Sequence, residues 1–361
     1  MVRLTLRLRI SLGIPSRVAE IDRYRPDDRS AVDALYLRVF GDAAAESYRQ
    51  RWEWLYSRNP NLPDGSPLIW LAREGAAIVG QYATMPVRLS VNGVEIDAAW
   101  GTDFMIAPER QRLGLGKVLL ENADRNVGAS LWLSLTDASH AMWTKMQRPD
   151  LGRIPRLAKP LSRRALSVSR DPNWRVETAK IPWRRVATRL RPLGGVIRKI
   201  NHFDHSFTEL WERVGPRFAF AVRRDAAYLN WRFVDAPHAQ YSIAACMRNG
   251  DTAGYVVLRH VAEPRWRVTI VVDFLADPGD SSAMMTLLRW VDREALAANS
   301  DLIRAQSTHV VFNERFRKSG YYDRKRSMRF VAKINAVQVP LNFYDSVDEW
   351  HVTFGDSDAD R

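Results

Sequence analysis

The sequence predicts an α+β protein in which one fold occurs twice. Three observations lead to this prediction. The pair Asn92-Gly93 lies between two short runs of alternating apolar residues, a pattern typical of an antiparallel hairpin. A glycine-rich turn within 106–117 joins the end of an expected strand to the start of an expected helix. Five short patterns of the first half also recur, in the same order, in the second half.

Around the glycine turn, the chain alternates between strand and helix patterns. A short strand is expected at 21–24, and apolar residues at helical spacing predict an amphipathic helix at 31–40. The hairpin strands flank Asn92-Gly93, and a further strand at 100–106 leads into the turn. After the turn we expect a helix and then a strand, at 118–126 and 130–135.

The repeated patterns have nearly constant spacing. The offsets between corresponding patterns are 175, 177, 170, 168 and 173 residues. Asp103-Phe104, for example, corresponds to Asp273-Phe274. The other patterns pair Leu35–Gly41 with Leu210–Gly215, Trp54–Pro60 with Trp231–Pro237, Leu119-Leu120 and Asp124-Arg125 with Leu287-Leu288 and Asp292-Arg293, and Trp143–Gln147 with Phe316–Tyr321.

The glycine turn has the chemistry of a phosphate-binding loop. Gly114 and Gly116 place no side chain between the backbone and a ligand, and they permit unusual dihedral angles. The helix that follows directs free N–H groups and the positive end of its dipole toward the turn. Such a turn can hold a pyrophosphate without a metal. The turn therefore indicates a nucleotide-bearing cofactor, and so an enzyme.

Two common nucleotide loops are excluded by single positions. A dinucleotide fingerprint needs a third glycine where Leu119 stands. A Walker loop needs a serine or threonine after the lysine and a glycine five residues before the last glycine. Here Val118 follows Lys117, and Gln111 occupies the glycine position.

The remaining pattern resembles the acyl-CoA loop of the GNAT acetyltransferases. The residues that carry the resemblance are Ile106, Pro108, Gln111, Gly114 and Gly116, with isoleucine in place of the family's valine. The resemblance implies, for each copy of the fold, a mixed and mostly antiparallel sheet flanked by helices. It also implies direct transfer of an acyl group from acyl-CoA, acetyl-CoA first of all, to an amine, without a covalent enzyme intermediate.

The resemblance also assigns the cofactor-binding residues. In GNAT domains the strand before the loop splays from its neighbour and hydrogen-bonds the pantetheine arm, which here maps onto 104–107. The pyrophosphate maps onto the backbone N–H groups of 111–117, where Arg112 and Lys117 either add positive charge or face water. The expected cofactor-binding residues are Phe104, Met105, Ile106, Gln111, Arg112, Leu113, Gly114, Leu115, Gly116 and Lys117.

An ammonium acceptor must lose a proton before it attacks, so the site needs a base or a water chain. Asp103 is the nearest carboxylate on the strand before the loop. Its counterpart Asp273 lies in a copy without the loop, which favours a structural role for both. His140, shortly after the strand at 130–135, is the alternative base.

The expected proton donor is missing. Many GNAT enzymes use a tyrosine on the last helix to protonate the leaving thiolate. The aligned residues here are Trp143 and Phe316, which have no phenol. Tyr82, on the strand before the hairpin turn, is a candidate substitute. Otherwise the CoA thiolate leaves unaided and takes a proton from water.

The second copy departs from the first in its turn. The turn begins Gly279-Asp280, is two residues shorter and lacks the second glycine. The carboxylate of Asp280 would repel a phosphate. We therefore expect the first copy to hold the cofactor. The second copy either shapes the acceptor site or serves as a structural partner.

The organisation predicted for the chain has five parts. The last part contains Trp350–Asp358, which resembles the C-terminus of GNAT-like proteins associated with bacterial surface-polysaccharide assembly. This resemblance implies an amino sugar as the acceptor, which is either a small molecule or linked to a lipid or a nucleotide. The five parts are a basic tail (1–18), a GNAT domain (19–160), a basic linker (161–198), a degenerate GNAT-like domain (199–340) and a C-terminal tail (341–361).

The net charge of +13 is concentrated in one segment. Residues 148–199 contain fifteen Lys and Arg but only Asp150, Asp171 and Glu177 as acids. This segment is either a solvated linker with a short helix near 186–190, or a surface for anionic lipid headgroups, a lipid-linked phosphate or RNA. It has few aromatic residues for base stacking, so nucleic acid is not the expected partner.

The composition is that of a globular, intracellular protein. The single cysteine, Cys246, excludes an intrachain disulfide and a multi-cysteine metal site, and no metal is expected. No apolar run is long enough to span a bilayer, and charges interrupt the apolar residues of 1–18 as they would not in a secretory signal. We expect a cytoplasmic protein, with peripheral contact to the inner membrane through 148–199.

Two other functions compete with N-acyl transfer. Aminoacyl transferases of the FemAB type also pair two GNAT-like domains and use aminoacyl-tRNA. The basic segment would fit that substrate, but an intact CoA loop argues against it. A non-catalytic CoA-binding module that keeps the fold is the third alternative, since fold alone does not determine function.

Overall fold

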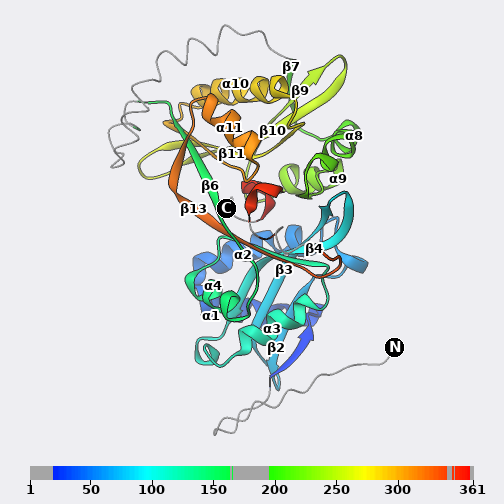
Figure 1. Cartoon of the computed structure of the whole chain (residues 1–361). Coiled ribbons are helices and arrows are strands. Elements are labelled where there is room, and N and C mark those ends of the chain that lie inside the picture. The colour runs from blue at the N-terminus through cyan, green and yellow to red at the C-terminus, as the bar shows by residue number, and fades with distance from the viewer. Residues whose placement is uncertain (1–18, 163–164, 166–194, 340–343, 345, 358–361) are drawn as a thin grey trace. The chain divides into compact units, whose positions relative to one another are not determined.

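The computed structural model describes residues 19–162, 165, 195–339, 344 and 346–357 (Figure 1). These residues form two compact units. Unit 1 contains residues up to 88, 96–149 and 331–339, and unit 2 contains 89–95, 150–330 and 344–357. The expected tail at 1–18 and the helix expected near 186–190 lie outside the described residues.

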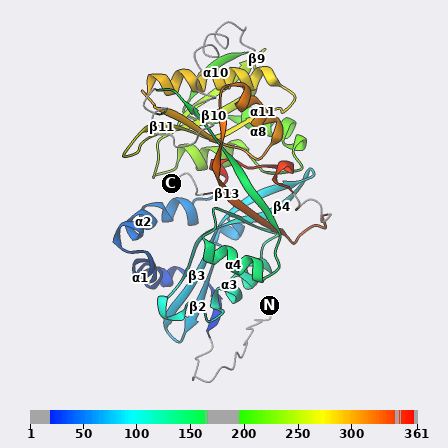
Figure 2. The same ribbon diagram turned by 60° about the vertical axis from the view of Figure 1, so that its left-hand side comes forward.

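Unit 1 contains the strands β1 to β5, with two helices between β1 and β2, one between β4 and β5 and one after β5. These strands follow the order β1-β2-β3-β4-β5, in which β4 and β5 are parallel and the pairs β1–β2 and β2–β3 are antiparallel. Figure 2 shows α1 and α2 on one side of β2 and β3, with α3 and α4 on the other. The bounds are β1 Glu20–Arg23, α1 Arg29–Phe40, α2 Asp42–Tyr56, β2 Ile69–Glu74, β3 Ala77–Val91, β4 Val94–Ile106, α3 Leu115–Asp124, β5 Ala129–Leu133 and α4 Asp137–Lys145.

The inner face of α2 explains why this helix packs on the sheet. Tyr48, Trp52 and Tyr56 recur every four residues and therefore lie on one face of the helix. All three are at most 5% exposed. Burial of each large side chain stabilises the fold by about 2–3 kcal/mol relative to an exposed one. This aromatic face positions α2 against β3 and β4, where the candidate site lies.

Unit 2 contains a run of strands of the same kind. Its strands follow the order β13-β6-β12-β11-β10-β9-β7, and only β11 and β12 are parallel among the pairs with a described register. A small strand, β14, also pairs in parallel with β8. The bounds are β6 Asp150–Pro160, β7 Val196–Ile200, α8 His205–Val214, β8 Phe220–Val222, α9 Ala226–Leu229, β9 Ser242–Arg248, β10 Asp251–Ala262, β11 Arg267–Ala276, α10 Ser281–Ala297, β12 Leu302–Gln306, α11 Val310–Lys318, β13 Tyr322–Ile334 and β14 Trp350–His351.

The two units do not follow the order of the chain. Residues 150–160, which the sequence prediction assigned to the first domain, form β6 and pair with β12 within unit 2. In return, 331–339 belongs to unit 1, where the N–H groups of Asn335 and Ala336 donate to the carbonyl of Gly128 at 2.7 and 2.9 Å. The five-part division of the chain stays a prediction.

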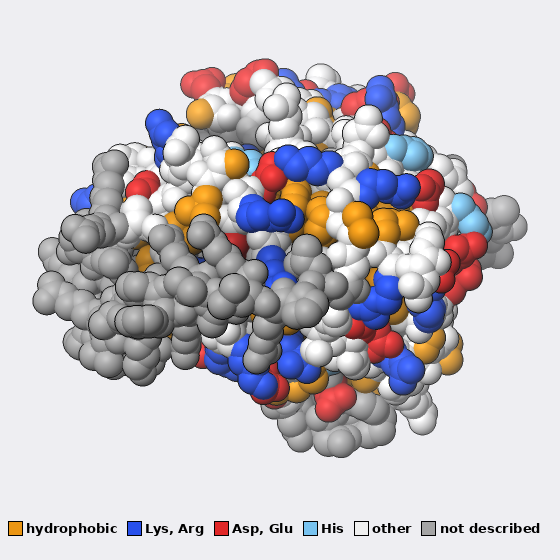
Figure 3. Space-filling view, turned by 90° about the horizontal axis from the view of Figure 1, so that it is seen from above, with side chains coloured by type: hydrophobic (Ala, Val, Ile, Leu, Met, Phe, Trp, Pro, Cys, Tyr) orange, Lys and Arg blue, Asp and Glu red, His pale blue; other side chains and the backbone are white. Residues whose placement is uncertain are grey.

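The predicted fold class is confirmed: the protein is a mixed α+β structure whose mostly antiparallel sheets are flanked by helices. The Asn92-Gly93 turn joins β3 to β4 as expected. In the described ranges, no helix combines the length and the apolar character needed to cross a bilayer. On the face in Figure 3, Lys and Arg side chains lie among acidic and hydrophobic ones.

Candidate functional site

The glycine turn of unit 1 presents a row of five backbone amides. It lies between the end of β4 and the start of α3 at Leu115. Arg112 and Gly114 adopt positive φ angles of 64° and 83°, which turn successive N–H groups toward one side. Among the described residues, the N–H groups of 112–116 have no hydrogen-bond acceptor. Free amides at a helix N-terminus form a site for an anion such as pyrophosphate.

The basic residues at the turn differ in their availability. Arg110 is held by Glu74 through a hydrogen bond of 2.7 Å. Lys117 pairs with Glu121 at 3.7 Å, and both side chains are exposed, so this pair contributes little. Arg112 is exposed and has no acidic partner within the described part of the chain. Arg112 is therefore the cation beside the amides that is free to meet a phosphate.

A gap opens between β4 and β5 next to this turn. The two strands pair only from Ala98 to Trp100 on β4, whereas β4 continues to Ile106. At the point of divergence, a β-carbon on Gly101 would lie 2.5 Å from Cε2 of Trp132. Only glycine permits this approach, because real β-carbons do not come so close to another atom. Beyond Trp100, β4 therefore runs on without β5 as its pairing partner.

Aromatic side chains line unit 1 beside the gap. Tyr82 stacks on Trp132 with ring centroids 5.2 Å apart, and Phe104 meets both rings edge to face at 5.5 and 5.7 Å. A β-carbon on Gly116 would lie 3.0 Å from Cζ of Phe104. Glycine at this position therefore lets the first turn of α3 approach β4 closely.

Tyr82 is a buried phenol. Its side chain is 1% exposed. Burial raises the pKa of Tyr82 well above its usual value, and the nearby carboxylate of Asp124 adds to this effect. Tyr82 therefore stays protonated at neutral pH and is not a base.

Asp103 is held by tyrosines from the two helices that follow β1. The hydroxyl of Tyr56 donates to Asp103 Oδ2 at 2.6 Å, and that of Tyr36 donates to Oδ1 at 3.3 Å. Tyr56 also lies 3.0 Å from the hydroxyl of Thr102. Burial, followed by the Asp103 carboxylate, raises the pKa of Tyr56 well above its usual value, so it remains a donor. The sequence analysis did not identify Tyr36 or Tyr56 as site residues. For Tyr56 a signal was available, because its spacing from Tyr48 places both on the same face of α2.

The other two candidates lie in different surroundings. His140 is half-buried in the first turn of α4 rather than in a loop. Trp143, which occupies the position of the family's tyrosine, is 1% exposed and donates from Nε1 to the carbonyl of Pro149 at 2.8 Å. The tyrosines that donate to the Asp103 carboxylate lie on α1 and α2, whereas Tyr82 packs against Phe104 and Trp132.

In unit 2 the corresponding amides are already occupied. Asp280 caps α10 by accepting from the N–H groups of Ser282 and Ala283 at 3.1 and 3.0 Å. Arg248 donates to the same carboxylate at 2.6 Å. Although partial burial acts in the opposite direction, Arg248 and the capped amides hold the pKa of Asp280 below its usual value. The carboxylate thus fills the position that an anion would take, in addition to repelling a phosphate as the sequence suggested.

Comparisons with known proteins agree with this geometry. The family model described as an acetyltransferase (GNAT) domain matches residues 20–134, from β1 to the end of β5. Among solved structures, the chain is similar to a GCN5-related N-acetyltransferase from Anabaena variabilis ATCC 29413, with a TM-score of 0.60, 13% identity, and coverage of 88% of this chain and 72% of that chain. A GCN5-related N-acetyltransferase from Kribbella flavida gives a TM-score of 0.58, 14% identity and coverage of 88% and 72%.

The similarity extends to an enzyme with a larger acyl group. The Saccharomyces cerevisiae N-myristoyltransferase, solved with bound myristoyl-CoA and inhibitors, gives a TM-score of 0.53, 12% identity and coverage of 90% of this chain and 81% of that chain. No curated protein sequence matches the chain significantly. These likenesses define the class of the protein by its fold, which is the GNAT fold. The match to an acetyltransferase (GNAT) domain is confined to residues 20–134.

Proposed function

We propose that the protein is an acyl-CoA-dependent N-acyltransferase whose cofactor binds in unit 1. Acetyl-CoA is the acyl donor to test first. One observation carries the proposal: the row of free amides at 112–116, which begins at a positive-φ residue and ends at a helix N-terminus. The pyrophosphate of CoA accepts hydrogen bonds from these amides, and Arg112 adds charge.

The gap beside β4 receives the pantetheine arm in this proposal. The arm runs from the turn along the part of β4 beyond Trp100, where β5 has stopped pairing. The thioester is thereby held beside the acceptor amine, and this alignment supplies a large part of the rate enhancement. The amine attacks the thioester carbonyl, a C–N bond forms, the C–S bond breaks, and CoA leaves as a thiolate.

Two proton transfers complete the reaction. The amine must lose a proton, and Asp103 is the proposed base because Tyr36 and Tyr56 orient its carboxylate. His140 is the alternative base. The thiolate must gain a proton, and Tyr82 is the proposed donor because its buried phenol stays protonated.

The proposed acceptor is a small amine, in particular an amino sugar carried by a lipid or a nucleotide. Such an acceptor is anionic, which suits a chain with a net charge of +13. The basic segment at 148–199 lies largely outside the described residues. Its contact with an anionic membrane surface, and a cytoplasmic location at that surface, are part of the proposal.

Equilibrium dialysis with radiolabelled acetyl-CoA tests the cofactor site. The variant Gly114→Glu places a carboxylate among the free amides and should abolish binding. The control is Gly93→Glu in the hairpin turn, because both glycines have φ near +82° and neither would have an atom within 4 Å of an added β-carbon. The two variants therefore introduce the same negative charge and a similar backbone strain. Only Gly114→Glu introduces the charge among the free amides of 112–116.

Acetyl-CoA binding by the two variants shows whether the cofactor binds at the free amides. Lost binding in Gly114→Glu with retained binding in Gly93→Glu would support the site. Unchanged affinity in both variants would mean that the cofactor binds elsewhere. Release of CoA thiol in the presence of a panel of amino sugars, and its absence with aminoacyl-tRNA, would separate N-acyl transfer from aminoacyl transfer. Binding without release on any amine would leave a binding module.

A further inference from the structure

Unit 2 repeats the strand gap of unit 1. Strands β11 and β12 pair in parallel only from Val268 to Val271 on β11, and β11 then continues to Ala276. In unit 1, β4 and β5 likewise pair over Ala98–Trp100 before β4 continues alone. The repeat noticed in the sequence thus includes the opening between the two parallel strands.

The C-terminal segment Trp350–Ser357 contacts the β11 side of this gap. Nε2 of His351 lies 3.1 Å from the carbonyl oxygen of Phe274. The hydroxyl of Thr353 donates to Asp273 Oδ1 at 2.7 Å. Asp273 and Phe274 both lie on the part of β11 that has separated from β12.

The same segment contacts the β12 side through one residue. Thr308 lies two positions beyond the end of β12. Its N–H donates to the carbonyl of Val352 at 3.2 Å, and the N–H of Val352 donates to its hydroxyl oxygen at 3.0 Å. The hydroxyl of Thr308 in turn donates to the carbonyl of Trp350. Because the segment is bonded to both walls, it lies in the gap.

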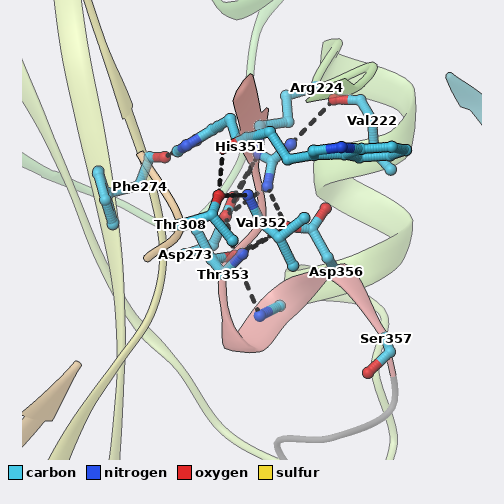
Figure 4. A network of polar contacts seen from close by, with 12 residues as sticks. Val222, Arg224, Asp273, Phe274, Thr308, His351, Val352, Thr353, Asp356 and Ser357 are labelled. Carbon is cyan, nitrogen blue, oxygen red and sulfur yellow. Dashed lines mark hydrogen bonds and ion pairs between the residues drawn. The ribbon is translucent and has the colours of Figure 1, made fainter. Parts of the chain in front are cut away.

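Two buried arginines fix the end of the segment, and Figure 4 shows Arg224 beside Asp273 and Asp356. Arg224 donates to Asp273 at 3.1 Å and to Asp356 at 2.6 Å. Arg232 donates to the carbonyls of Gly355 and Ser357 at 3.1 and 2.8 Å. Both arginines are at most 1% exposed. Charge-assisted hydrogen bonds in such a dry environment are strong and directional.

The segment also fits its surroundings sterically. A β-carbon on Gly355 would lie 2.8 Å from Cζ of Phe233 and 3.1 Å from Cβ of Asp273. Trp350 stacks on Phe220 with centroids 4.4 Å apart. Every residue from 350 to 357 is buried. The close fit and the paired polar groups are those of a recognised peptide rather than of a chain end that only rests on the surface.

We propose that the strand gap of unit 2 is a peptide-binding site whose ligand is the chain's own segment Trp350–Ser357. This peptide takes the place in unit 2 that the pantetheine arm takes in unit 1, a comparison that rests on the proposed function. Asp280 closes the matching anion position. Unit 2 therefore binds no acyl-CoA, and the chain binds one molecule.

Hydrogen–deuterium exchange of the full chain, read by mass spectrometry, tests the peptide site. Buried, hydrogen-bonded amides in 350–357 should exchange at least about 100-fold more slowly than those of a free peptide. Thr353→Val removes the hydroxyl bonded to Asp273, and Gly355→Val introduces the close contacts above. Either variant should speed exchange in 350–357 by about tenfold or more, which corresponds to about 1.4 kcal/mol.

Thr269→Val is the matched control. Like Thr353, Thr269 is a buried threonine whose hydroxyl is hydrogen-bonded, but it lies on β11 and its partners are His260 and Ser300. It should leave exchange in 350–357 unchanged. Free exchange of 350–357 in the unaltered chain would overturn the inference, whether or not the variants fold. So would two acetyl-CoA molecules per chain with loss of protection in 350–357. Failure to bind any acetyl-CoA, with 350–357 still protected, would overturn the proposed function and leave the peptide site standing.

Discussion

The hydroxyl of Tyr56 and the carboxylate of Asp103 form a 2.6 Å hydrogen bond inside the core of unit 1. Because Asp103 is 4% exposed, water cannot replace a donor that is removed. Tyr56→Phe should therefore lower the free energy of unfolding by about 1–3 kcal/mol. Urea denaturation followed by tryptophan fluorescence measures this change.

Tyr228→Phe is the control for that prediction. Tyr228 is 4% exposed, and its hydroxyl is buried without a hydrogen-bond partner in the described structure. Its removal should change the free energy of unfolding by less than about 0.5 kcal/mol, or raise it. Equal losses in the two variants would show that the bond to Asp103 contributes nothing specific.

The proposed acid and base can be separated from structural residues by kinetics. Asp103→Asn keeps the shape of the side chain but cannot take a proton, so kcat should fall by about 10²–10⁴-fold while acetyl-CoA binding is retained. Tyr82→Phe should slow the reaction when the leaving thiolate needs a proton. His140→Gln should have little effect when Asp103 is the base. If Asp103→Asn lowers only stability, and kcat per folded molecule is unchanged, Asp103 is structural.

Arg148 and Asp124 form a buried ion pair in unit 1, with each side chain 4% exposed. The hydroxyl of Ser130 also donates to Asp124 at 2.6 Å. Arg148→Met would leave the Asp124 carboxylate buried beside fewer donors, and we expect a loss of about 3–5 kcal/mol in the free energy of unfolding.

The exposed pair between Arg25 and Asp22 provides the comparison, since these side chains are 69% and 42% exposed. Arg25→Met should cost no more than about 1 kcal/mol. Urea denaturation at the same ionic strength measures the loss in the free energy of unfolding for both variants. Similar losses for Arg148→Met and Arg25→Met would contradict the assignment of Arg148 to a buried pair.

The buried imidazole of His351 predicts a loss of stability in mild acid. Burial, with the charges of Arg224 and His309 nearby, lowers the pKa of His351 well below its usual value. The folded state therefore keeps His351 neutral, whereas the unfolded chain takes up a proton as the pH falls below about 6.5. The free energy of unfolding should decrease by about 1.4 kcal/mol per pH unit for this histidine below that value.

Urea denaturation between pH 7.5 and 5.5 measures the slope. Burial also lowers the pKa values of His260 and His309, which add to the loss in the same direction. His351→Asn should remove the part of this pH dependence of the unfolding free energy that comes from protonation of His351. Carboxylates such as Asp280, whose pKa is lowered, also stabilise the folded state. Their contribution to the free energy of unfolding is lost only as the pH falls below about 4, which is outside this range. An unchanged slope in His351→Asn would contradict the prediction.

The parts of the structure that depend on local sequence were predictable. The Asn92-Gly93 turn determines a hairpin because few other residues accept its backbone angles. Gly114 and Gly116 indicated the turn before α3 for the same reason. The alternation of strands and helices then followed from apolar periodicity, and the resemblance to a GNAT domain followed from the loop.

The parts that depend on distant partners were not predictable. Nothing local to 150–160 shows that this strand pairs with β12 rather than within its own half. Asp103 was found as a carboxylate on the right strand, but its tyrosine partners become visible only when α1 and α2 pack on the sheet. Asp280 was recognised as a negative charge, and its capping of α10 required the structure.

Neither unit is encoded by one uninterrupted stretch of the chain, because 331–339 completes unit 1 and 89–95 belongs to unit 2. A gene cut between the halves would yield two polypeptides that each lack a piece of their own sheet. Any attempt to express the first copy by itself must graft 331–339 onto it through an artificial linker. Simple truncation of the chain therefore cannot separate the two units.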